Sequence, residues 1–193
     1  MPMKKSASNR IVFLSGKKVV LRPISETDIS KMLKWINDPD VTQYIAVYMP
    51  VSENEEKQWV EDLSKKRQTD LVLGIETVKG VHIGNIGIHK ISWKDRTAEI
   101  GITIGDKNYW GKGYGSEAIF ILIKYSFSTL NLRKLSLSVL GNNPRAINCY
   151  KKCGFRFEGR LKNQIFKGGK YIDQIIMSVF KKNLNRLPKY ENV

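Results

Sequence analysis

The chain has few of the residues that stabilise secreted or membrane proteins. Its 193 residues include only two cysteines, Cys149 and Cys153, and two histidines, His82 and His89. Both cysteines fall on one predicted helix, where a disulfide would be strained, so we interpret them as ordinary thiols of a cytoplasmic protein. The histidines lie far from them in sequence, and we expect no metal site. The apolar run at residues 11–14 is too short for a signal peptide, and no run approaches a membrane span.

Acidic residues are also scarce. The chain holds 18 Asp and Glu against 33 Lys and Arg, a formal net charge of +15. Most of the excess lies in residues 101–193, which hold 17 basic and 5 acidic residues. A field of this size attracts anions at long range. The positive charge is consistent with binding a polyanionic small molecule, or with a basic surface that only aids solubility. Docking on ribosomal RNA is a further alternative.

Apolar periodicity outlines one domain in which strands and helices alternate. Strands are expected at 17–23, 71–76, 81–91, 97–104, 135–139, 155–161 and 171–180, and helices at 29–36, 53–62, 113–130 and 144–153. These seven strands and four helices predict an α/β (α+β) fold on a mixed sheet. We assign residues 15–183 to the domain, 1–14 to a flexible basic leader and 184–193 to a C-terminal tail.

A glycine-rich segment lies between the strand 97–104 and the following helix. Gly111, Gly113 and Gly115 stand at alternate positions. A turn without side chains lets consecutive backbone N–H groups face one anion, and the positive end of the next helix adds partial charge. The segment favours a phosphate-binding turn, with an ordinary connection as the alternative. It matches neither a Walker A motif nor a dinucleotide fingerprint.

A second segment, after the strand 135–139, narrows the assignment. Its key residues are Asn143, Ala146, Tyr150, Lys152, Gly154 and Phe155. This pattern, Asn-x-x-Ala-x-x-x-Tyr-x-Lys-x-Gly-Phe, together with the glycine turn resembles the GNAT superfamily of acetyl-CoA-dependent N-acetyltransferases. The resemblance covers residues 19–180. One departure is Trp110, which occupies the Gln or Arg position of the family's cofactor turn.

The resemblance implies the GNAT fold, in which the sheet splays between its fourth and fifth strands, here 97–104 and 135–139. The pantetheine arm of acetyl-CoA would lie in this gap like an extra strand and satisfy unpaired backbone groups. Asn143 would bond the arm or cap a helix, and Asn148 is a candidate for the same task. The implied cofactor contacts are Ile102, Thr103, Ile104, Trp110, Gly111, Lys112, Gly113, Tyr114, Gly115, Ser116, Asn143, Asn148 and Lys152.

Two catalytic residues are expected. Tyr150 matches the family tyrosine that protonates the departing thiolate, a task that suits a weak acid, and packing is its alternative role. Glu99 is the candidate base, because a partly buried carboxylate has a raised pKa and relays protons through water. Its alternative is an ion pair with a cation such as Arg96. His82 and His89 are expected to be structural, with His89 the better placed near the cleft.

The early helices line the acceptor side in GNAT folds, and the helix 53–62 is acidic. Its acidic residues are Glu53, Glu55, Glu56, Glu61 and Asp62. Such a patch would suit a cationic amine, although a solvated helix face is the alternative for most of these residues. The segments 35–41 and 157–173 resemble the branch that includes ribosomal-protein, sugar-amine and spermidine acetyltransferases.

We therefore expect an enzyme that moves the acetyl group of acetyl-CoA to a primary amine by direct attack in a ternary complex. A protein N-terminus, a polyamine and an amino sugar all remain as acceptors. A non-catalytic acyl-CoA sensor or an RNA- or ribosome-docking module is the alternative, and a homodimer also stays open.

Overall fold

The computed structural model describes residues 11–186 of the chain. Its strands in this range are β1 (Leu14–Ser15), β2 (Val19–Pro23), β3 (Leu71–Thr77), β4 (His82–Ser92), β5 (Thr97–Ile104), β6 (Lys134–Leu140), β7 (Arg156–Lys167) and β8 (Lys170–Phe180). Its α-helices are α1 (Ile29–Ile36), α2 (Pro39–Thr42), α3 (Glu53–Lys65), α4 (Tyr114–Ser128) and α5 (Pro144–Lys152). Short 3₁₀ turns lie at Glu26–Asp28, Lys107–Tyr109 and Lys181–Arg186.

All of these strands form one mixed sheet in the order β1-β2-β3-β4-β5-β6-β8-β7. Every pair is antiparallel except β5 and β6, which run parallel. The β5–β6 pairing covers only Thr97 to Glu99 on β5, and the two strands then diverge. The expected mixed sheet is confirmed, and so is the splay between the strands 97–104 and 134–140. These are the fifth and sixth strands rather than the fourth and fifth, because the short strand β1 precedes those that were expected.

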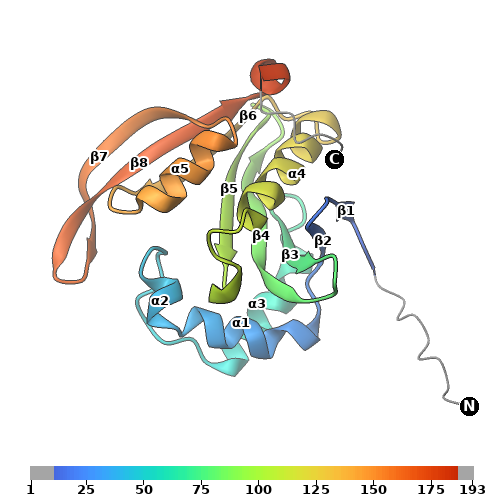
Figure 1. Cartoon of the computed structure of the whole chain (residues 1–193), viewed down its shortest axis with the longest axis vertical. Coiled ribbons are helices and arrows are strands. Elements are labelled where there is room, and N and C mark those ends of the chain that lie inside the picture. The colour runs from blue at the N-terminus through green and yellow to red at the C-terminus, as the bar shows by residue number, and fades with distance from the viewer. Residues whose placement is uncertain (1–10, 187–193) are drawn as a thin grey trace, which may run out of the picture.

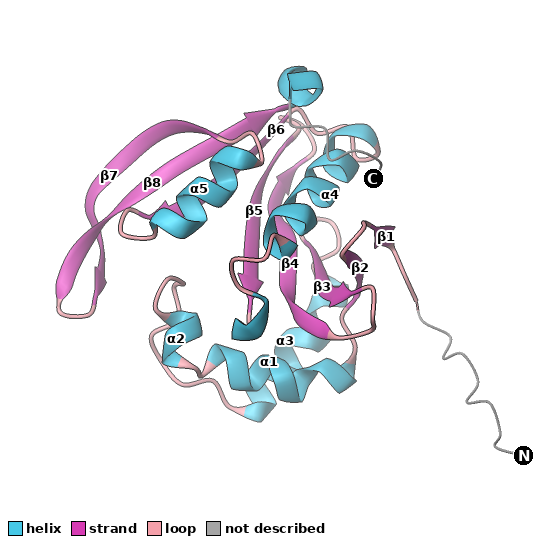
Figure 2. Ribbon diagram, viewed as in Figure 1, coloured by secondary structure: helices cyan, strands magenta, loops and turns pink. Residues whose placement is uncertain are grey.

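The two faces of the sheet carry different side chains because residues alternate along each strand. Ile102 and Ile104 face α4, since a Cβ built on Gly115 of that helix would lie 3.7 and 3.5 Å from them. The opposite face carries Gly101 and His89. Figure 2 shows α1, α2 and α3 grouped together at one end of the molecule, apart from α4 and α5.

The helix starts follow local sequence signals. Capping boxes open the turn after Ser25 and the helix α3 after Ser52. The short helix α2 was not expected, because four residues carry too little periodicity. Its first residue, Pro39, also follows directly on the residues that end α1. Its start is nevertheless well specified, since Asp38 caps it and Pro39 is its first residue.

Helix α3 buries an acidic side chain more deeply than an aromatic one, since Trp59 is 37% exposed and Glu56 only 8% exposed. Residues 1–10 of the predicted leader and 187–193 of the predicted tail lie outside the described residues. Between residues 11 and 186, every helix is too short or too polar to cross a membrane.

The β7–β8 hairpin extends away from the body of the molecule and curves toward α2 (Figure 1). Its turn lies at Gly168 and Gly169, both with a positive φ that favours glycine. The Lys167 ammonium next to this turn donates to the carbonyls of Thr42 and Ile45 at 2.6 and 2.5 Å. The hairpin tip is thereby tied to the end of α2 and the loop that follows it.

Candidate active site

A cavity of about 1100 Å³ opens where β5 and β6 diverge. One wall consists of the glycine turn and α5, and the other of residues from α1, α3 and the loop after α2. The cavity therefore joins the two faces of the sheet through the gap between the strands. It places the glycine turn, the segment after β6 and the acidic helix α3 around one space.

The edge of β5 that faces this cavity lacks a strand partner. From Ile100 to Ile104, β5 pairs with β4 but has no partner on the β6 side. The Trp110 indole donates to the Ile104 carbonyl at 2.6 Å, which satisfies the last of these groups and fixes the ring. The remaining edge suits an extended, amide-bearing ligand that pairs with backbone groups.

The glycine turn has the backbone shape that the sequence suggested. Gly111 and Gly113 have φ values of 72° and 86°, a left-handed conformation that favours glycine. Gly113 is the N-cap of α4, so the first N–H groups of that helix have no partner within it. Lys112 and Tyr114 do not line the cavity, in contrast to the other expected contacts.

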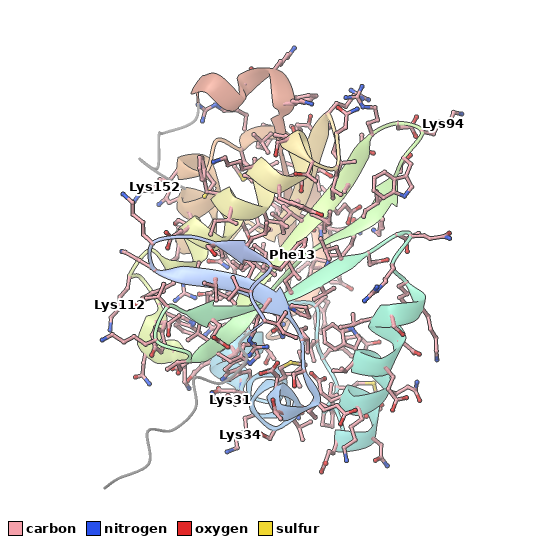
Figure 3. All side chains as sticks on the ribbon, turned by 90° about the vertical axis from the view of Figure 1, so that its right-hand side faces the viewer. Phe13, Lys31, Lys34, Lys94, Lys112 and Lys152 are labelled. Atoms are coloured by element: carbon pink, nitrogen blue, oxygen red, sulfur yellow. The ribbon has the colours of Figure 1, made fainter. Side chains whose placement is uncertain are left out.

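Two cations that the sequence reasoning missed lie at this turn. The Lys18 ammonium donates to the Lys112 carbonyl at 3.1 Å. The Arg145 guanidinium lies over the Trp110 ring, 4.2 Å from its centroid. In Figure 3, Lys112 and Lys152 extend from the same edge of the molecule. These cations surround a turn of unpartnered N–H groups, an arrangement that favours a phosphate-bearing ligand.

The Tyr150 side chain lies in the cavity wall on α5. Its ring packs edge-on against Phe155 at 5.9 Å, and no described residue hydrogen-bonds its hydroxyl. Burial raises the pKa of this hydroxyl, and the nearby Cys149 and Cys153 thiols raise it further. The phenol therefore stays protonated near neutrality and retains a proton to donate.

The other expected contacts on α5 also line the cavity. Asn143 caps the helix, because its Oδ1 accepts from the Ala146 N–H at 3.1 Å, and its amide nitrogen is left for a ligand. Asn148 and Lys152 are exposed in the cavity wall. The Cys149 sulfur lies 3.2 Å from the Ser116 hydroxyl and so connects α5 to the first turn of α4.

Glu99 does not have the environment expected of it. Its side chain is 49% exposed and forms an ion pair with Lys90 at 3.0 Å, rather than with Arg96. It is absent from the cavity wall, whereas its neighbours Ile100 and Gly101 belong to it. The expected partial burial is wrong. Lys90, which has a positive φ in the β-bulge after His89, lies close enough to pair with this carboxylate.

The acidic helix α3 divides into paired and unpaired carboxylates. Glu53 pairs with Lys57 at 2.8 Å, and Asp62 pairs with Lys65 at 2.7 Å, both on the solvent side. Glu55 lines the cavity but accepts from the Ser52 N–H and hydroxyl in the capping box. Glu56 lines the cavity, is buried, and has no ion-pair partner among the described residues. Burial raises its pKa.

Comparisons with known proteins agree with this geometry. The family model described as the acetyltransferase (GNAT) domain matches residues 18–156. An uncharacterised N-acetyltransferase, p20 of Bacillus licheniformis, is 31% identical and covers 88% of this chain and 96% of its own. Spermidine N(1)-acetyltransferase of Escherichia coli K12 is 30% identical, covering 86% and 88%. The crystal structure of spermidine N-acetyltransferase from Vibrio cholerae with CoA and spermine superimposes with a TM-score of 0.81 at 26% identity, covering 86% and 98%.

Proposed function

This chain belongs to the GNAT family of acetyltransferases and is an acetyl-CoA-dependent N-acetyltransferase, and we propose that its acceptor is a polyamine. The observation that carries the proposal is the Glu56 carboxylate, which is buried in the cavity without an ion-pair partner among residues 11–186. A buried charge of this kind is costly unless a ligand supplies the opposite charge.

The surroundings of Glu56 support the same class of acceptor. Trp35, Tyr44 and Trp59 also line this part of the cavity. Aromatic faces attract ammonium groups, and an elongated polycation can contact a carboxylate and several rings at once. The relatives named as spermidine acetyltransferases point to the same acceptor class.

For acetyl-CoA, we propose that the unpaired edge of β5 at Ile102, Thr103 and Ile104 holds the pantetheine arm. The N–H groups from Gly111 to Ser116 would bind the pyrophosphate, with Arg145 and Lys18 adding positive charge. The positive φ of Gly111 and Gly113 and the missing β6 partner support this placement. Asn143 and Asn148 would bond the arm, and Lys152 would attract the negative charge of the cofactor's phosphates.

The reaction follows from this arrangement. The neutral amine attacks the thioester carbonyl, a C–N bond forms and the C–S bond breaks. We propose that Tyr150 gives its proton to the leaving sulfur, since its hydroxyl is free of other hydrogen bonds from described residues and its raised pKa keeps it protonated.

A panel of amines tests the acceptor. Thiol release from acetyl-CoA should be fastest with spermidine or spermine, compared with glucosamine, an aminoglycoside and a peptide N-terminus. Glu56→Gln should raise the spermidine KM about tenfold, or ~1.4 kcal/mol, and leave the acetyl-CoA KM unchanged. Glu53→Gln is the matched control, because it removes the same charge from a residue outside the cavity wall. Equal KM changes in both variants, or a preference for glucosamine, the aminoglycoside or the peptide N-terminus, would refute the polyamine assignment.

A further inference from the structure

His89 is the only histidine of residues 11–186 that lines the cavity. Its ring lies over two glycines. A Cβ built on Gly87 would lie 2.9 Å from its Nε2, and one built on Gly101 would lie 3.6 Å from it. The imidazole therefore lies over Gly87 of β4 and its cross-strand partner Gly101 of β5, one residue before Ile102 and beyond the last β5–β6 pair. The ring belongs to the wall of the cavity that enters the gap between β5 and β6.

The other ring nitrogen of His89 is held by a carboxylate. Nδ1 lies 2.8 Å from Oδ1 of Asp70, whose second oxygen accepts from the Thr69 hydroxyl at 2.6 Å. Burial raises the pKa of Asp70, but the hydrogen bonds from Thr69 and His89 prevail and lower it. An ionised carboxylate only accepts, so Nδ1 carries the proton of a neutral ring and the lone pair remains on Nε2. No described residue hydrogen-bonds Nε2.

We propose that His89 is the general base of the acetyl transfer and that Asp70 is its positioning residue. The inference rests on the amine acceptor proposed above. As the amine nitrogen attacks the thioester carbon, it must lose one proton, and Nε2 accepts it. Tyr150 gives one proton to the departing sulfur, so the products are the N-acetyl amine and the CoA thiol. Water then takes the proton from His89, and the Tyr150 hydroxyl regains a proton from water. The net result is the transfer of one proton from the amine to the sulfur.

The charged side chains near His89 come from several elements. Asp70 before β3 bonds the ring, and Glu99 on β5 is the cross-strand partner of His89 and pairs with Lys90. Lys66 after α3 acts on Asp70, and Glu55 and Glu56 on α3 line the same cavity. Glu99 is satisfied by Lys90, and Glu55 by its capping box. Asp70 alone of these bonds directly to the imidazole. Asp70 and His89 are thus arranged like the carboxylate and histidine of a catalytic triad. In such a pair the carboxylate fixes the tautomer of the imidazole and stabilises the imidazolium.

The pH profile of kcat/KM tests the role. In wild type, log kcat/KM should fall with a slope of two at low pH, because both the amine and the imidazole must be neutral. His89→Gln should lower kcat/KM by roughly 10²- to 10⁴-fold and leave a slope of one, since only the amine then titrates. Asp70→Asn should lower kcat/KM without changing the acetyl-CoA affinity. Asp95→Asn, in the exposed β4–β5 turn, is the control.

Rescue of a His89 variant by imidazole and the tautomer of the His89 ring provide two further tests. His89→Ala should regain activity with added imidazole, which a structural role would not allow. Nitrogen NMR of the wild-type chain should show that the neutral ring carries its proton on Nδ1 and not on Nε2, whether or not any amine turns over. A reversed tautomer, or His89→Gln with wild-type kcat/KM and slope, would overturn the inference. If spermidine proves a poor acceptor, the same profiles measured with the best amine of the panel still decide the role of His89.

Discussion

Arg145 and Trp110 are stacked, with the guanidinium carbon 4.2 Å from the ring centroid. The ring is itself fixed, because its Nε1 donates to the Ile104 carbonyl at 2.6 Å. Trp110 stands at the Gln or Arg position of the family's cofactor turn, and the stacked guanidinium is a cation beside this position. Arg145 comes from the first helical turn of α5.

Arg145→Gln should raise the acetyl-CoA KM about tenfold, because a cation near the proposed pyrophosphate site is lost. Trp110→Leu should have a similar effect, since it removes the surface that orients the guanidinium. Steady-state kinetics with acetyl-CoA as the varied substrate measures both, and Arg156→Gln on exposed β7 is the control. An unchanged KM in Arg145→Gln would show that the stack has no part in cofactor binding.

Gly113→Val should abolish detectable acetyl-CoA binding while the fold survives. The φ of 86° at Gly113 is strained for a β-branched residue, and a side chain would enter the proposed pyrophosphate site. Gly115→Ala is the comparison, because its added Cβ would make only ordinary contacts of 3.5 Å or more with the protein. Calorimetry on variants with native circular dichroism measures the affinity. Wild-type affinity in a folded Gly113→Val would refute the phosphate assignment of the turn.

Tyr150→Phe should lower kcat by roughly 10- to 10⁴-fold and leave the acetyl-CoA affinity unchanged, since only proton donation is removed. No described residue bonds the hydroxyl, so stability should not fall. Because burial raises the pKa of Tyr150, wild-type kcat should not decline on the alkaline side before about pH 10. Tyr125→Phe on α4 is the control. Full activity in Tyr150→Phe would return this residue to a packing role.

The sequence predicted the parts of the fold that carry strong periodicity. β5 begins and ends where expected, and α4 and α5 follow from the glycine turn and the Asn143 segment. The two-residue β1 and four-residue α2 were missed because segments so short carry no period. Such elements become visible only through their backbone pairing and caps.

Site features that depend on strand register could not be predicted. Lys90 in the bulge after His89 pairs with Glu99, and alternation along β4 gives no sign of this bulge. The Asp70–His89 contact joins residues 19 apart, and Lys18 reaches a carbonyl 94 residues away. Motif spacing found the residues of the turn and of α5, whereas the side chains that orient or neutralise them come from distant segments.

Cys149 should react with iodoacetamide much faster than Cys153, and CoA should slow the reaction. Hydrogen bonds from Cys153 and Ser116 lower the pKa of Cys149 although burial opposes them, whereas Cys153 is buried and its pKa is raised. At any given pH a larger fraction of Cys149 than of Cys153 is therefore the reactive thiolate. Cys153→Ser should weaken the first of these hydrogen bonds and slow the labelling of Cys149. Peptide mapping by mass spectrometry measures the site, and equal labelling of both cysteines would contradict the prediction.

Asp28→Asn should destabilise the fold by about 3 kcal/mol at neutral pH, because it removes the carboxylate that neutralises Arg22 in a buried network. Asp28 is 4% exposed and accepts from the two terminal nitrogens of Arg22 at 2.7 and 2.8 Å and from the Ser25 N–H at 2.8 Å. Glu76 also binds the guanidinium, through Nε at 2.5 Å. The network joins β2 and β3 to the turn that opens α1, so its loss should loosen the start of that helix.

The pH dependence of the free energy of unfolding tests the role of the Asp28 carboxylate more directly. Burial alone would raise the pKa of its carboxyl, but the hydrogen bonds from Arg22 and His82 hold it well below the ordinary value. A depressed native pKa contributes stability that is fully present above the unfolded value of about 3.9 and is lost as pH falls through the native value. Urea unfolding between pH 7 and 3 should therefore show the wild type converging on Asp28→Asn as pH falls below about 4, with Asp95→Asn following the wild type. Parallel curves for wild type and Asp28→Asn would mean that the Asp28 carboxylate is not the ionised partner of Arg22.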